Sequence, residues 1–153
     1  MTYKIRVVED ITELNKVLKF CYDILGEHDD NDNVYGPAAW ANRLNENYLM
    51  IFAEADGEIL SAVMGKAENP DSIVLGFAAC RADCRNNGIT GSLRSKLENN
   101  ARKYGYKYIT LGSADESTGF YEKCGYHIIT EMYGQKLYQK PIVLSYQNCD
   151  LDK

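Results

Sequence analysis

The spacing of apolar residues changes several times along the chain and predicts alternating strands and helices. In the first part it predicts a strand at 3–8, followed by a helix whose apolar residues recur every three or four positions. Asp10 with Glu13 three residues later is a typical signal for the start of that helix. A shorter helix is expected at 37–44, where Pro37 suits the first turn.

The middle of the chain predicts a β-hairpin and a third strand. Residues 48–55 and 58–66 are strand-like, and the Asp-Gly pair at 56–57 is a strong turn signal between them. A turn at 69–71 then precedes an apolar strand at 72–81.

From Gly88 the pattern becomes that of an amphipathic helix with a period of about 3.6 residues. The residues predicted to share its apolar face are Ile89, Leu93, Leu97, Ala101 and Tyr104. The residues predicted to lie opposite are Arg94, Ser95, Glu98, Arg102 and Lys103. Gly105 is a suitable stop for this helix.

The last third predicts a strand at 106–111, which is parallel to the preceding strand if the helix is a crossover. A short helix at 117–124 ends at Gly125, and strands at 126–132 and 135–143 follow. The resulting order, β-α-α-β-β-β-α-β-α-β-β, predicts a mixed α/β sheet with helices on its faces.

Composition fits one soluble globular domain over residues 1–153, with 45% hydrophobic and 25% charged residues. No apolar run approaches the roughly 20 residues that span a bilayer, and the N-terminus lacks the apolar core of a signal peptide. Five cysteines, an odd number without paired spacing, indicate reduced thiols and a cytoplasmic location. The net charge of −5 argues against nucleic acid and favours a cationic partner.

The junction between the apolar strand and the amphipathic helix has the features of an anion site. Its sequence is Arg85-Asn86-Asn87-Gly88-Ile89-Thr90-Gly91. The first amides of a helix have no internal partners, and the helix dipole adds partial positive charge. Gly88 and Gly91 let the backbone approach a bulky anion such as a pyrophosphate.

Two motifs resemble those of the GNAT superfamily of N-acetyltransferases. The family loop Arg/Gln-x-x-Gly-x-Gly/Ala appears as Arg85-Asn86-Asn87-Gly88-Ile89-Thr90, and the late aromatic-Tyr-Glu-Lys-x-Gly-aromatic motif appears as Phe120-Tyr121-Glu122-Lys123-Cys124-Gly125-Tyr126. The element order matches from about Tyr3 to Val143. The resemblance implies an α/β fold with a GNAT-like mixed, mostly antiparallel twisted sheet of about six to seven strands, helices on both faces and a central parallel strand pair.

The resemblance also implies an acyltransferase that moves an acetyl group from acetyl-coenzyme A to a primary amine without a metal. The cofactor-binding residues that it implies are Ala79, Cys80, Arg81, Arg85, Asn86, Asn87, Gly88, Ile89, Thr90, Gly91, Ser92 and Ser117. One backbone N–H near 79–81 then faces the thioester carbonyl. Tyr121 is similar in position to the family's general acid. A packed aromatic residue is the alternative, since the chain has 12 tyrosines.

Three residues depart from the family pattern. Thr90 replaces Gly or Ala, Ala114 stands where many members have an Asn that contacts the pantetheine arm, and Ala82 replaces a frequent Pro. Thr90 and Ala114 keep open a second function, a non-catalytic acyl-coenzyme A binding sensor or regulatory module. The general base is either a strand carboxylate or a chain of waters, and the candidate carboxylates are Glu54, Glu58, Glu68 and Glu131.

The acceptor is expected to be a small-molecule amine or a protein amine. Asp29, Asp30 and Asp32 lie in a loop that shapes the acceptor site in this family, and they predict a cationic acceptor. A solvated acidic loop is the favoured interpretation of this segment over a metal site that includes His28. Trp40 is either a core anchor or a wall of the acceptor site. The resemblance is compatible with a homodimer, and neither a nucleic-acid nor a membrane partner is expected.

Cys80 and Cys84 flank the strand expected to contact the cofactor and are interpreted as small packed thiols. His127 falls within a predicted strand and is interpreted as structural.

Overall fold

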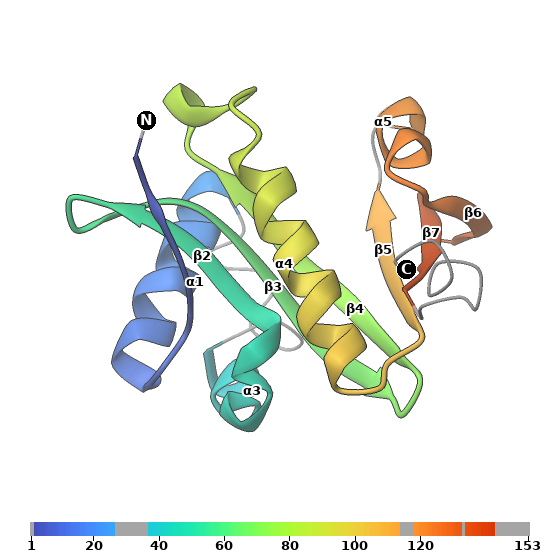
Figure 1. Cartoon of the computed structure of the whole chain (residues 1–153), viewed down its shortest axis with the longest axis horizontal. Coiled ribbons are helices and arrows are strands. Elements are labelled where there is room, and N and C mark those ends of the chain that lie inside the picture. The colour runs from blue at the N-terminus through green and yellow to red at the C-terminus, as the bar shows by residue number, and fades with distance from the viewer. Residues whose placement is uncertain (1, 27–36, 114–117, 133, 143–153) are drawn as a thin grey trace, which may run out of the picture. The chain divides into compact units, whose positions relative to one another are not determined.

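The computed structural model describes residues 2–26, 37–113, 118–132 and 134–142 (Figure 1). The chain divides into two compact units. The first unit consists of Met1–Lys66 and Gly76–Leu97, and the second consists of Ala67–Leu75 and Glu98–Lys153. The single domain expected from the sequence stays a prediction.

Seven strands form one mixed sheet. Their bounds are β1 Lys4–Val7, β2 Met50–Ala55, β3 Glu58–Asn69, β4 Ser72–Cys80, β5 Tyr108–Ser113, β6 His127–Met132 and β7 Gln135–Pro141. The strand order is β1-β2-β3-β4-β5-β7-β6. The pairs β1–β2, β2–β3, β5–β7 and β6–β7 are antiparallel, whereas β4 and β5 are parallel from Ser72↔Tyr108 to Val74↔Thr110. The predicted fold class and element order are confirmed.

Four α-helices and two short 3₁₀ helices complete the described elements. They are α1 Ile11–Leu25, α3 Pro37–Ala41, η1 Leu44–Leu49, η2 Ala82–Cys84, α4 Ile89–Lys103 and α5 Thr118–Lys123. The Asp10 carboxylate accepts the Glu13 N–H at 2.9 Å, so the predicted cap of α1 is confirmed. The helix predicted at 37–44 ends earlier, because the Arg43 N–H bonds Trp40, three residues back, instead of continuing the α pattern.

The turn between β2 and β3 is the predicted two-residue hairpin. Asp56 and Gly57 have φ angles of 52° and 79°, the left-handed conformation that suits the twist of the flanking strands. None of the helices formed by the described residues is long and apolar enough to cross a membrane.

In the first unit, helices cover both faces of the strands. Helices α1 and α3 pack on one face, and the buried cluster there contains Val8, Leu14, Val17, Leu18, Cys21, Trp40, Met50, Phe52, Ala62, Met64, Phe77 and Ala79. Ser61 points to the other face, since successive residues of a strand alternate, and there it contacts Thr90 at the start of α4. Figure 1 shows β2 and β3 between α1 and α4.

Trp40 is a core anchor of this unit, with only 1% of its surface exposed. Its ring centroid lies 5.8 Å from that of Phe77. A Cβ added at Gly76 on β4 would lie 3.0 Å from the Trp40 ring, so a larger residue at that position would require the indole to shift. Burial in the same cluster raises the pKa of the Cys21 thiol to about 12.

The predicted faces of α4 are correct at four apolar positions and wrong at two others. Ile89, Leu93, Leu97 and Ala101 are buried as predicted. Tyr104 lies beyond the end of the helix and is 63% exposed. Glu98, predicted on the solvent face, is only 7% exposed, because it belongs to a polar cluster in the second unit.

That cluster joins α4 to the late motif and to β7. The Lys140 Nζ lies 2.8 Å from a Glu98 carboxylate oxygen, and the Tyr126 hydroxyl donates to the other at 3.1 Å. Gly125 has a φ of 95°, and a Cβ added there would lie 3.2 Å from the Lys140 Cε. The motif glycine therefore leaves room for the lysine that neutralises the buried carboxylate.

We expect Lys140→Met to lower the free energy of unfolding by about 2–4 kcal/mol, because it leaves the Glu98 carboxylate buried without its cation. The double variant Glu98→Leu/Lys140→Met should recover much of that loss, since it removes the buried charge together with its partner. Urea denaturation of both variants measures the difference. Losses that simply add in the double variant would argue against a coupled pair.

His127 begins the edge strand β6, all six residues of which are exposed. It has no place in the core, so the structural role expected for it is limited to this exposed strand. Cys84 is buried and Cys80 is half-buried, in accord with their interpretation as packed thiols.

Candidate functional site

The segment between β4 and α4 is a turn anchored at both ends and open between them. Cys84 and Ile89 are buried, whereas the residues from Arg85 to Gly88 are exposed. Asn86 and Gly88 have φ angles of 67° and 76°. Glycine adopts this left-handed conformation without cost, and asparagine does so more readily than most residues.

The start of α4 leaves backbone donors without partners in the helix. Its first backbone bond runs from the Ser92 N–H to the Gly88 carbonyl at 3.0 Å. The N–H groups of Ile89, Thr90 and Gly91 precede it and therefore have no acceptor within the helix. A Cβ added at Gly88 or Gly91 would meet no atom within 4 Å, so there is free space beside the backbone at both positions. This geometry suits a bulky anion.

The side chain of Thr90 points toward the sheet. Its hydroxyl lies 2.8 Å from the Ser61 hydroxyl, which itself donates to the Ala79 carbonyl at 2.9 Å. Because Ser61 has a single proton, Thr90 is the donor in the first of these bonds. Thr90, which replaces the Gly or Ala of the family loop, therefore places its hydroxyl against β3.

The backbone of β4 presents alternate residues to its two edges. The Arg81 N–H donates to the Leu60 carbonyl at 2.9 Å, and the Ala79 carbonyl accepts from Ser61, so both groups face β3. The N–H and carbonyl of Cys80 consequently face the opposite edge. Within the predicted stretch 79–81, Cys80 is thus the residue whose backbone is directed away from β3.

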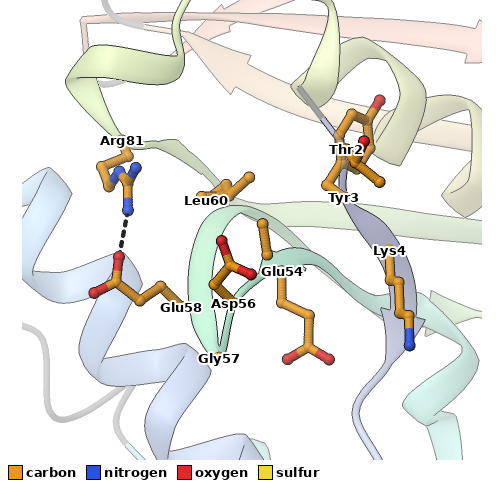
Figure 2. A pocket seen from close by; sticks show the side chains of 10 residues that line it. Thr2, Tyr3, Lys4, Glu54, Asp56, Gly57, Glu58, Leu60 and Arg81 are labelled. Carbon is orange, nitrogen blue, oxygen red and sulfur yellow. Dashed lines mark hydrogen bonds and ion pairs between the residues drawn. The ribbon is translucent and has the colours of Figure 1, made fainter.

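The guanidinium of Arg81 is already paired with two carboxylates. It donates to Glu58 at 2.9 Å and to Asp83 at 2.6 and 3.0 Å, and it lowers the pKa of Asp83. Figure 2 shows Arg81 paired with Glu58. Both residues line a cavity of about 580 Å³, which Lys4 and Asp56 also line. Arg85, in contrast, is exposed, and in the described part of the chain no carboxylate forms an ion pair with it. Arg85 is therefore the better placed cation for an anionic ligand.

Tyr121 lies in the second unit, on α5, where it is half-buried among aromatic rings. Its ring centroid is 5.2 Å from that of Tyr138, 5.3 Å from that of Phe120 and 6.1 Å from that of Tyr126. These contacts hold the ring in place. Ser117 and Ala114 lie outside the described residues.

The candidate carboxylate bases differ in their surroundings. Glu54 is ion-paired with Arg6 at 3.0 Å and Glu58 with Arg81, whereas Glu68 and Glu131 are exposed. The acidic loop with His28, Asp29, Asp30 and Asp32 lies outside the described residues. Among the residues that are described, no three His, Cys, Asp or Glu side chains gather in a group that could hold a metal.

Among the described residues of this region, Ser61 is the one buried side chain with a polar contact that the sequence did not single out. Of the described polar residues it is among the few that are fully buried. The feature of the sequence that could have identified Ser61 is its position as a lone hydroxyl residue inside the apolar run from Leu60 to Met64.

Comparison with protein families identifies an acetyltransferase (GNAT) domain at residues 26–136, which is most of the chain. Comparison with curated protein sequences gives no significant match.

Solved structures with similar folds are remote in sequence. The PaiA N-acetyltransferase of Thermoplasma acidophilum in complex with coenzyme A aligns with a TM-score of 0.74 at 16% identity, covering 92% of this chain and 99% of that one. An aminoglycoside 6'-N-acetyltransferase complexed with coenzyme A gives 0.73 at 14% identity, covering 95% and 99%. A ribosomal-protein-alanine N-acetyltransferase from Escherichia coli gives 0.71 at 18% identity, covering 96% and 98%.

The sheet with its parallel β4–β5 pair, the turn that opens α4 and the family match over most of the chain lead to one assignment: the protein belongs to the GNAT acetyltransferase family.

Proposed function

We propose that the protein is an N-acetyltransferase that moves the acetyl group of acetyl-coenzyme A to a primary amine. The observation that carries this proposal is the start of α4, where the N–H groups of Ile89, Thr90 and Gly91 have no acceptor within the helix and a Cβ added at Gly88 or Gly91 would meet no atom within 4 Å. Membership of the GNAT family supports the reaction class. The coenzyme A complexes of two structural relatives support the choice of cofactor.

Particular groups are proposed for binding the cofactor and for activating its thioester. The amides at the start of α4 hold the cofactor's diphosphate, with Arg85 as the neighbouring cation. The Cys80 N–H, directed away from β3, donates to the thioester oxygen as the amine attacks the carbonyl carbon. A donor of this kind is typically worth about 3 kcal/mol of transition-state stabilisation.

Tyr121 is proposed to donate its phenolic proton to the thiolate that leaves when the C–S bond breaks. A phenol has an ordinary pKa near 10 and a thiol near 8.5, so the phenol is protonated at neutral pH and able to donate. The acceptor nitrogen loses its proton to a base that is either a carboxylate or water.

The acceptor is proposed to be a cationic small-molecule or protein amine. This choice rests on the net charge of −5 and on the acidic residues of the loop at 28–33. Structural relatives act on both kinds of substrate, since one is an aminoglycoside acetyltransferase and another a ribosomal-protein-alanine acetyltransferase.

The proposal predicts release of coenzyme A from acetyl-coenzyme A with a cationic amine, and an apparent affinity for that amine that weakens as salt rises. A thiol-release assay over a panel of polyamines, aminoglycosides, amino acids and peptides, repeated at two ionic strengths, measures both effects. Preference for an anionic amine with turnover indifferent to salt would contradict the cationic acceptor. Cofactor binding without thiol release over the whole panel would favour the sensor function instead.

A further inference from the structure

Three groups on three different elements of the first unit form a continuous chain of hydrogen bonds. Thr90 on α4 donates to Ser61 on β3 at 2.8 Å, and Ser61 donates to the Ala79 carbonyl on β4 at 2.9 Å. Ser61 has no exposed surface, and Ala79 is 2% exposed. Water therefore has little access to the bond between Ser61 and Ala79, and the two hydrogen bonds are a fixed part of this unit.

The two ends of this hydrogen-bond network are Thr90 and Ala79. Each lies next to a backbone group that the proposed function assigns to cofactor binding. Thr90 carries one of the three open N–H groups at the start of α4. Ala79 directly precedes Cys80, whose N–H faces the edge away from β3. A glycine or alanine at position 90, as in the family motif, has no hydroxyl and could not form this link.

We propose that Thr90 and Ser61 are positioning residues, which fix the start of α4 against β4 so that one cofactor molecule can meet both sites. This inference rests on the proposed function, because it assigns the diphosphate to the α4 amides and the thioester to Cys80. A donor that is already oriented loses less conformational entropy when the ligand binds. The link therefore favours binding of the whole cofactor without touching it.

The test compares variants at position 90 that differ in the hydroxyl. Thr90→Val has nearly the same shape as threonine but lacks the donor, and it should weaken coenzyme A binding about five- to twentyfold. Thr90→Ser keeps the hydroxyl and should stay within about twofold of the original affinity. Titration calorimetry with coenzyme A measures the dissociation constants. Thermal unfolding without cofactor reports whether each variant is folded.

A second pair of variants tests whether the two hydroxyls act together. Ser61→Ala should weaken coenzyme A binding as Thr90→Val does, and the double variant should bind no more weakly than the weaker single variant. With an active amine, the loss should appear in the KM for acetyl-coenzyme A, while kcat and the KM for the amine change little. Should Thr90→Val fail to fold, Ser61→Ala and Thr90→Ala provide the same comparison.

The outcomes separate the two proposals. Equal affinities of the Val, Ser and original proteins for coenzyme A would overturn the positioning role while leaving the proposed function intact. Fully additive losses at positions 61 and 90 would also overturn it. If the protein without substitutions does not bind coenzyme A at all, the proposed function is overturned, and the positioning role with it.

Discussion

Replacing Tyr121 by Phe is expected to lower the turnover number roughly 10²- to 10⁴-fold, the usual contribution of a general acid. The substitution removes one hydroxyl and keeps the ring, so the contacts with Phe120, Tyr126 and Tyr138 persist and the second unit should fold normally. Affinity for coenzyme A should change little, because the loss falls on the transition state. Steady-state kinetics together with calorimetry of cofactor binding measure both quantities.

Two controls sharpen this test of Tyr121. Tyr104→Phe makes the same chemical change at a residue that is 63% exposed and lies beyond the end of α4, and it should leave turnover unaffected. An acyl donor whose thiol is more acidic needs less help from an acid, so the defect of Tyr121→Phe should shrink with that donor. Near-normal turnover of Tyr121→Phe, with chemistry shown to be rate-limiting, would return Tyr121 to the role of a packed aromatic residue.

Gly88→Asp is expected to abolish the stabilisation of the protein by acetyl-coenzyme A. In the original protein, cofactor at 100 times its dissociation constant should add about 2.7 kcal/mol to the free energy of unfolding and raise the melting temperature. The variant places a carboxylate where the diphosphate is proposed to bind, and like charges repel. A Cβ at position 88 meets no neighbouring atom, so the only backbone cost is that of placing a non-glycine residue at a φ of 76°, and the variant should still fold.

Gly57→Asp is a matched control for this substitution. Gly57 has a φ of 79°, close to the 76° of Gly88, and a Cβ added there also meets no atom within 4 Å. The two variants therefore share the backbone strain and the added charge, but Gly57 lies in the β2–β3 turn. The thermal shift with acetyl-coenzyme A should persist in Gly57→Asp. A folded Gly88→Asp protein with the original cofactor affinity would refute the assignment of the loop.

Features set by neighbouring residues could be predicted from the sequence. The Asp10 cap, the turn at Asp56 and Gly57 and the element order depend on residues a few positions apart, and the structure confirms them. Backbone preferences and apolar spacing act over this short range. The start of α4 at Ile89 could be predicted for the same reason.

Features set by distant partners could not be predicted in this way. Glu98 is buried because Lys140, 42 residues later, neutralises it, and the amphipathic pattern of α4 does not contain that information. Thr90 meets Ser61 across 29 residues, and neither residue is unusual in its local sequence context except as a hydroxyl beside apolar neighbours. Side-chain pairs of this kind depend on how strands and helices pack.

The burial of Trp40 gives the protein an internal optical label. It is the chain's single tryptophan, and it lies in the core of the first unit against Gly76 and Phe77. Selective excitation of the indole therefore reports on that unit, which holds the proposed cofactor loop. The tyrosines of both units contribute to near-ultraviolet circular dichroism together with Trp40, so indole fluorescence is the signal that is specific to the first unit. It allows the unfolding of that unit to be followed in the unmodified protein.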